Sequence, residues 1–121
     1  MTYVDGFVLS VKKENRAKYK KMAQEAAETW KKFGALDYKE CRMDDAKPNM
    51  VQFPFPKMAK TKEGEETWFS FIVFKSKAER TRINKEVMKY FEAKYSAEDY
   101  KNMPFDMKRL AYGGFKTEVE I

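Results

Sequence analysis

The chain has 121 residues, of which 43% are hydrophobic and 16% aromatic, and its formal net charge is +6. These values predict one globular domain over residues 1–121 and exclude a disordered chain. The sequence contains no histidine and one cysteine, which removes the commonest general base, the commonest transition-metal ligand and any internal disulfide. Because neither a signal peptide nor a membrane-spanning run is present, we expect a cytoplasmic protein that makes no membrane contact.

The first third of the chain alternates between strand and helix patterns. Residues 3–11 predict a strand that is apolar on both faces, with Asp5 inside it. Apolar residues at helical spacing then predict a helix over 15–33, which Gly34 ends. A second strand over 35–43 mixes charged and apolar residues, as is typical of a strand at the edge of a sheet.

A long connection precedes the most apolar segment of the chain. Residues 44–66 show neither the helical nor the strand periodicity of apolar residues, and only 56–60 favour a short helical turn. Residues 67–74 then carry apolar side chains in both alternating sets. A strand of this kind needs cover on both faces and is therefore expected at the centre of the sheet.

The last third predicts another helix and another strand. Ser76 and Glu79 have the capping-box spacing that begins a helix over 77–93, and a short helix follows over 96–100. Residues 108–118 predict the fourth strand. Within it, the pair at 113–114 is two glycines, which mark a bulge or a close backbone approach.

This order of elements predicts an α+β fold of the ferredoxin-like, split βαβ type. Its antiparallel four-stranded sheet has the strand order 4-1-3-2, and both long helices lie on one face. The other face would expose aromatic and β-branched side chains, so we expect a homodimer of the dimeric α/β-barrel kind, in which two sheets pack together. The alternative is a monomer whose residues 44–66 fold across the sheet.

Several segments resemble the YbaA-like family of uncharacterised bacterial proteins. They are Tyr-Val-Asp-Gly-Phe-Val at 3–8, Gly-Ala-Leu at 34–36 with the acidic residues that follow, Phe-Ser-Phe-Ile at 69–72, and the block from 103 to 115. The resemblance implies the dimeric α/β-barrel superfamily, which includes cofactor-free monooxygenases, isomerases and haem-handling enzymes. It implies no established activity. The basic helices and Met107 depart from the family pattern.

Asp5, Arg109 and Tyr112 are the candidate catalytic residues. A carboxylate in a central strand needs a partner, and Arg109 or Lys108 on the neighbouring strand is the expected one. Tyr112 is a candidate hydrogen-bond donor to a ligand oxygen, and Arg109 a candidate holder of a carboxylate or enolate. The structural alternatives are an internal ion pair for Asp5 and a core position for Tyr112.

The candidate ligand-binding residues are Glu40, Asp44, Trp68 and Asp106. Glu40, Cys41 and the aspartates at 44–45 cluster at the end of the second strand, where acid–base chemistry or a hard cation is conceivable. Spacing supplies no ligand motif, so we expect no metal and no cofactor; loop aspartates more often make turns, and Asp106 is expected to cap one. Trp68 is expected to line a cavity or to fill the core.

Three functions remain open from the sequence. The leading hypothesis is a homodimer that binds or transforms a small molecule in a cavity between its sheet and the long connection. The second is RNA binding, because basic residues concentrate near the start of the first helix: Lys12, Lys13, Arg16, Lys18, Lys20 and Lys21. No nucleic-acid motif accompanies them, and a solvated helix face is the favoured interpretation. The third is an accessory protein without a catalytic site.

Overall fold

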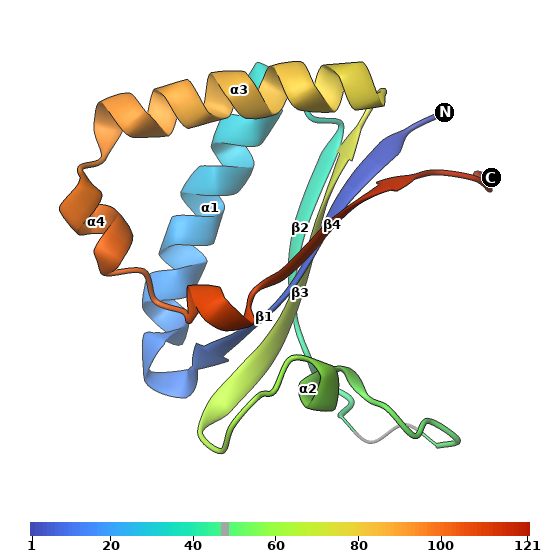
Figure 1. Cartoon of the computed structure of the whole chain (residues 1–121), viewed down its shortest axis with the longest axis vertical. Helices are drawn as coiled ribbons and strands as arrows, with labels where there is room; N and C mark the ends of the chain where they lie inside the picture. The colour runs from blue at the N-terminus through green and yellow to red at the C-terminus, as the bar shows by residue number, and fades with distance from the viewer. Residues whose placement is uncertain (47–48) are drawn as a thin grey trace.

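The computed structural model describes residues 1–46 and 49–121, which form a four-stranded antiparallel sheet with long helices on one face (Figure 1). The strands lie in the order β2-β3-β1-β4, with bounds β1 Tyr3–Lys12, β2 Asp37–Arg42, β3 Glu65–Phe74 and β4 Ala111–Lys116. This order confirms the predicted ferredoxin-like α+β fold, with the two doubly apolar strands at its centre.

The helices are distributed unequally between the two faces of the sheet. Helices α1 (Arg16–Phe33), α3 (Lys77–Lys94) and α4 (Ala97–Lys101) lie on one side, and the short α2 (Phe55–Met58) lies on the other (Figure 1). The predicted cap of α3 is confirmed, because Ser76 accepts a hydrogen bond from the backbone N–H of Glu79. Within the described ranges, no helix combines the length and the apolar character needed to cross a bilayer.

The helix-facing side of the sheet is the hydrophobic core. Leu9 of β1 lies opposite Trp68 of β3, and both pack against Tyr19 of α1. Further along the sheet, Ile72 and Phe74 pack against α3. The apolar stripes predicted for the helices therefore face the sheet, and the buried members of this core are Leu9, Val11, Tyr19, Ala23, Ala35, Trp68, Ile72, Phe74, Ile83 and Val87.

The opposite side, which we call the open sheet face, is defined by Val4, Phe69, Phe71, Val73 and Phe115. The Phe69 side chain is 41% exposed and that of Phe115 is 61% exposed. Residues 55–61 cover only one end of this side of the sheet, where the Thr61 hydroxyl forms hydrogen bonds with the hydroxyls of Ser10 and Thr67. The monomer alternative therefore accounts for only part of the cover that this face needs.

The last strand is shorter than predicted. Residues Met107–Arg109 form a 3-10 turn, capped by the Asp106 carboxylate, so β4 begins at Ala111. The glycines at 113–114 keep a continuous register with β1 and form no bulge. They do mark a close approach, because a Cβ atom on Gly114 would lie 2.5 Å from the Tyr3 hydroxyl oxygen.

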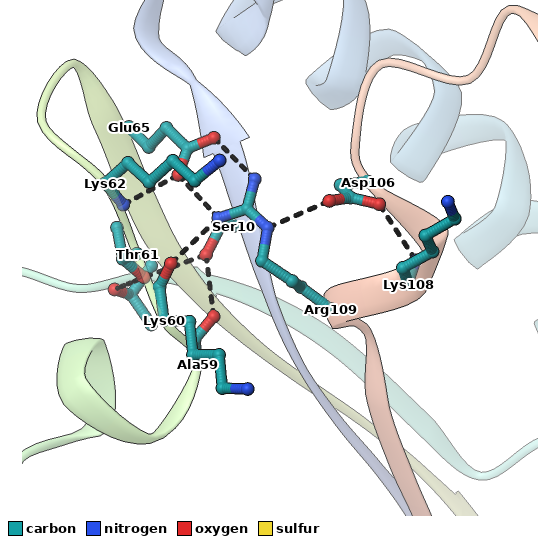
Figure 2. Close-up of polar contacts among 10 residues, drawn as sticks. Ser10, Ala59, Lys60, Thr61, Lys62, Glu65, Asp106, Lys108 and Arg109 are labelled. Atoms are coloured by element: carbon teal, nitrogen blue, oxygen red, sulfur yellow. Dashed lines mark hydrogen bonds and ion pairs between the residues drawn. The ribbon is translucent and has the colours of Figure 1, made fainter.

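Arg109 joins the end of the long connection to the segment before β4 (Figure 2). Its guanidinium donates hydrogen bonds of 2.7 Å to each carboxylate oxygen of Glu65 and one of 2.9 Å to Asp106. It also donates to the carbonyl oxygen of Lys60 at 2.9 Å. Both planar groups are largely buried, so this bidentate pair holds two segments that are distant in the sequence.

We expect this pair to stabilise the fold in a pH-dependent way. Arg109 holds the pKa of Glu65 at about 2, below the ordinary value of 4.5. Because the folded pKa is the lower one, the stabilisation is present above pH 4.5 and is lost as the pH falls toward 2. Arg109→Ala should lower the unfolding free energy by about 1–2 kcal/mol at pH 7, and the loss should shrink with acid, as measured by urea denaturation.

Arg82→Ala is the matched control, because Arg82 pairs with Glu79 on the exposed surface of α3. Removing an exposed pair should change the unfolding free energy by no more than about 0.5 kcal/mol. A difference between wild type and Arg109→Ala that stayed constant from pH 7 to acid would contradict the assignment.

Candidate functional site

Three carboxylate side chains project from the sheet toward the helices. Asp5 lies on β1, Glu40 on β2 and Glu66 on β3, at register positions opposite Ile72, Ser70 and Val11. A carboxylate on this side must be compensated, because a buried charge without a partner is costly. The three acids are compensated in different ways, and this difference identifies the candidate site.

Asp5 is held by side chains from α3 and β4. It accepts hydrogen bonds from the Tyr112 hydroxyl at 3.0 Å and from the Asn84 amide at 3.2 Å, and Nε of Arg80 lies 3.8 Å away. The predicted pairing of Asp5 with Arg109 or Lys108 is therefore wrong. The partner arginine comes from the helix above the strand, whereas Arg109 is engaged by Glu65 and Asp106.

Glu66 is paired with cations. Arg16 at the start of α1 forms a hydrogen-bonded ion pair with it, and Nη1 of Arg42 on β2 lies 3.6 Å away. The hydrogen bond from Arg16 is the main reason that the pKa of Glu66 lies below its ordinary value. Glu66 therefore stays ionised at neutral pH. The sequence analysis did not single out Glu66, although its parity within the β3 pattern places it on the helix side.

Glu40 is compensated by neutral groups. The hydroxyl groups of Tyr19 and Tyr38 each donate a hydrogen bond of 2.7 Å, one to each carboxylate oxygen. In the part of the chain that the structure describes, Glu40 forms no salt bridge. Burial raises the pKa of Glu40, and this effect outweighs the hydrogen bonds from the phenols and from Ser70, which lower it.

Glu40 lies in a cleft of about 450 Å³ between α1 and the β2 edge of the sheet, which we call the Glu40 cleft. Its polar and aromatic lining includes Tyr38 and Trp68. Three cations, Arg16, Lys20 and Arg42, also line it. Two of the residues predicted to bind a ligand, Glu40 and Trp68, thus share one cleft.

The other predicted site residues lie elsewhere. Asp44 is exposed in the connection after β2, and Asp106 accepts the hydrogen bond that caps the turn before β4. Cys41 is an exposed free thiol. Within residues 1–46 and 49–121, no three Cys, Asp or Glu side chains gather as a potential metal-binding group. The Glu40 cleft is also on the helix side of the sheet, whereas the predicted cavity was between the sheet and the long connection.

The Glu40 cleft combines groups suited to acid–base chemistry. Burial raises the pKa of Tyr19 and Tyr38 far above the ordinary 10.0, so both phenols keep their protons and act as donors. Glu40 and Glu66 have pKa values displaced in opposite directions by their surroundings. Such a separation is typical of sites in which one carboxyl exchanges a proton and another stays charged.

Comparison with known proteins supplies the family. Residues 2–107 match the model of a protein family described as "Protein of unknown function (DUF1428)". The chain is 39% identical over 120 residues to "Uncharacterized protein YbaA" of Escherichia coli strain K12, with 99% of each chain covered, and equally so to its counterpart in Shigella flexneri.

Among solved structures, the designed protein Foldit4 covers 98% of this chain and all of its own, with a TM-score of 0.48 and 13% identity, too low a likeness to bear on function. The family match and the near-complete alignment with YbaA agree with the resemblance in the sequence. The chain belongs to the DUF1428 family and is a YbaA-like protein.

Proposed function

We propose that this protein is a cytoplasmic homodimer, with one ferredoxin-like domain per subunit, that binds a small anionic molecule in the Glu40 cleft and exchanges a proton with it through Glu40. The observation that carries the proposal is the Glu40 carboxyl group, which is held by two phenols in a cleft lined by three cations. A small acid fits this charge pattern.

The geometry assigns a separate task to each group in the cleft. Lys20 attracts the anion, Arg16 and Arg42 add positive charge beside their shared partner Glu66, and the planar indole of Trp68 offers an apolar surface. The two phenols fix the Glu40 carboxylate from opposite oxygens, Ser70 adds a third hydrogen bond, and one lone pair of the carboxylate is left for a ligand proton. In the forward step Glu40 takes a proton from the bound molecule, forming its O–H bond as the ligand's bond to hydrogen breaks; the reverse step returns it.

Asp5 and Tyr112 have a different part in this proposal. Asp5 is 1% exposed and its contacts join β1 to α3 and β4, so the pair holds the helix layer on the sheet. Arg109 holds the long connection in the same manner. Neither group lines the Glu40 cleft, and the candidate chemistry therefore moves from these residues to Glu40.

The arrangement of basic residues favours a small anion over a nucleic acid. Arg16 and Lys20 line the Glu40 cleft, whereas Lys18 and Lys21 line a second cleft on the other side of α1. Arg16 is also committed to Glu66. The charges are thus divided between two concave sites, which favours small anions over one extended phosphate backbone.

Anion binding should depend on pH through Glu40. The ordinary glutamate pKa is 4.5 and that of Glu40 is raised. Glu40 therefore ionises at a higher pH than an ordinary glutamate does. A bound carboxylate should therefore bind more weakly as the pH rises through the Glu40 pKa. We expect at least one of acetate, succinate and phthalate to raise the melting temperature, with a dissociation constant that increases as the pH rises above 4.5.

Glu40→Gln should abolish this pH dependence, because glutamine keeps a hydrogen-bonding side chain but cannot ionise. Glu63→Gln is the control, since Glu63 is exposed in the connection before β3. The fluorescence of Trp68 reports the binding in a Trp30→Phe variant, because that substitution leaves Trp68 as the one tryptophan in the chain. Failure of all three acids to bind, or an unchanged pH profile in Glu40→Gln, would refute the proposal.

The homodimer in this proposal forms through the open sheet face. A second copy is the occupant that fits, because the face is apolar and its charged residues Asp37 and Lys39 already form an ion pair of 2.7 Å with each other. Phe69 and Phe71 pack side by side on it, with ring centroids 5.9 Å apart, and Phe55 of α2 extends the aromatic surface. Pairing two such faces buries these rings without burying an unpaired charge.

Phe69→Glu should convert the dimer into a monomer, because it places a carboxylate at the centre of the interface. Size-exclusion chromatography with light scattering measures the mass directly. Met107→Glu is the matched control, since Met107 is 58% exposed on the turn before β4, away from the open sheet face, and should leave the dimer intact. A wild-type protein that is monomeric at 100 µM, or a dimer that survives Phe69→Glu, would contradict this interface.

A further inference from the structure

A second cleft, of about 590 Å³, lies between α1, α3 and α4, on the side of α1 that faces away from the Glu40 cleft. We call it the interhelical cleft. Its walls are mainly apolar and come from three segments: Met22 and Trp30 of α1, Phe91 of α3, and Met103 after α4. Its volume is within the range of small-molecule sites, and methionine side chains adapt readily to a flexible ligand.

The charged side chains that line the interhelical cleft differ in the partners that they contact. Glu25 pairs with Lys94 at 3.0 Å and accepts from the Tyr95 hydroxyl, while Asp99 accepts from the backbone N–H and the hydroxyl of Ser96 in the capping box of α4. Lys21 acts on Glu25 by Coulomb attraction and, among the described residues, forms no ion-pair contact. An ammonium group is therefore left to face an apolar cavity.

Lys18 places a second ammonium group at the same end of the cleft. It donates to the backbone carbonyl oxygen of Asn102 at 3.1 Å, a neutral acceptor that leaves its charge uncompensated. The cleft thus has an apolar body and a positive end. This pattern is complementary to a molecule with an aliphatic body and one negative head group.

We propose that the interhelical cleft binds an amphipathic carboxylate, such as a medium-chain fatty acid, with its chain against Met22, Trp30 and Phe91 and its carboxylate at Lys18 and Lys21. This site is separate from the Glu40 cleft, and the proposal is independent of the proton exchange proposed there. Binding combines burial of the aliphatic chain with charge attraction at one end. Neither contribution requires the β-sheet to change its conformation.

Trp30 provides a reporter inside the cleft. Its indole N–H donates to the side-chain oxygen of Asn84 at 2.9 Å, and Asn84 in turn donates to Asp5, so the ring is held in place. The chain contains two tryptophans, and Trp68→Phe leaves Trp30 alone. A change in fluorescence of this variant therefore reports a molecule bound near Trp30, and substitutions of residues that line only the interhelical cleft locate it there.

The test titrates the full-length Trp68→Phe protein with decanoate and, in parallel, with decanol. We expect a saturable change in Trp30 fluorescence with decanoate and binding of decanol that is at least about threefold weaker. Adding Lys21→Ala should weaken decanoate binding by about threefold to tenfold. Lys31→Ala, on the same helix but in neither cleft, should leave it unchanged, and Ala26→Phe should abolish it by filling the cleft.

Met103→Glu provides a second block in case Ala26→Phe prevents folding, which circular dichroism monitors. This substitution adds a negative charge in the segment after α4 and should weaken the binding of decanoate more than the binding of decanol. Three results would overturn the proposal: no saturable response to decanoate, equal binding of decanoate and decanol, or equal losses from Lys21→Ala and Lys31→Ala. If decanoate binds here while small acids fail at the Glu40 cleft, only the proton-exchange proposal falls.

Discussion

The structure depends on covering a sheet face that carries three carboxylates. α1 and α3 bury the apolar side of β1 and β3, and this burial forces compensation on Asp5, Glu40 and Glu66. Arginines compensate two of them, whereas Glu40 receives two phenol hydrogen bonds and no cation in the described chain. Neutral donors stabilise a carboxylate less than a guanidinium does, so Glu40, whose pKa is raised, gains a proton more readily than Glu66, whose pKa is lowered.

The same two-sided character of the central strands connects the site with the proposed assembly. Helices close one side of the sheet, and residues 55–61 close only an end of the other. A second copy on the open sheet face would leave both clefts accessible, because they lie on the opposite, helix side. Helix α1 separates the two clefts and supplies cations to each: Arg16 and Lys20 to one, Lys18 and Lys21 to the other.

Much of the fold follows from local patterns in the sequence. Apolar alternation predicted the central strands, and the order of elements led to the strand order that the structure shows. Glu40 and Trp68 could be associated because β2 and β3 are neighbours, with Glu40 opposite Ser70 and Arg42 opposite Trp68. The predicted fourth strand pointed to Arg109 or Lys108 as the partner of Asp5. The partner is Arg80, because the rotation of α3 over the sheet depends on core packing and not on sequence distance.

The protonation of Glu40 is the claim on which the proposed chemistry depends most directly. Carbon-13 NMR of protein labelled at the glutamate side-chain carboxyl carbon, with Glu40 assigned by its loss in Glu40→Gln, would follow this group through a pH titration. We expect an apparent pKa above the ordinary 4.5, and a still higher one in Tyr38→Phe, since the Tyr38 hydrogen bond lowers the pKa of Glu40. Titration of Glu40 at or below 4.5 would contradict the account.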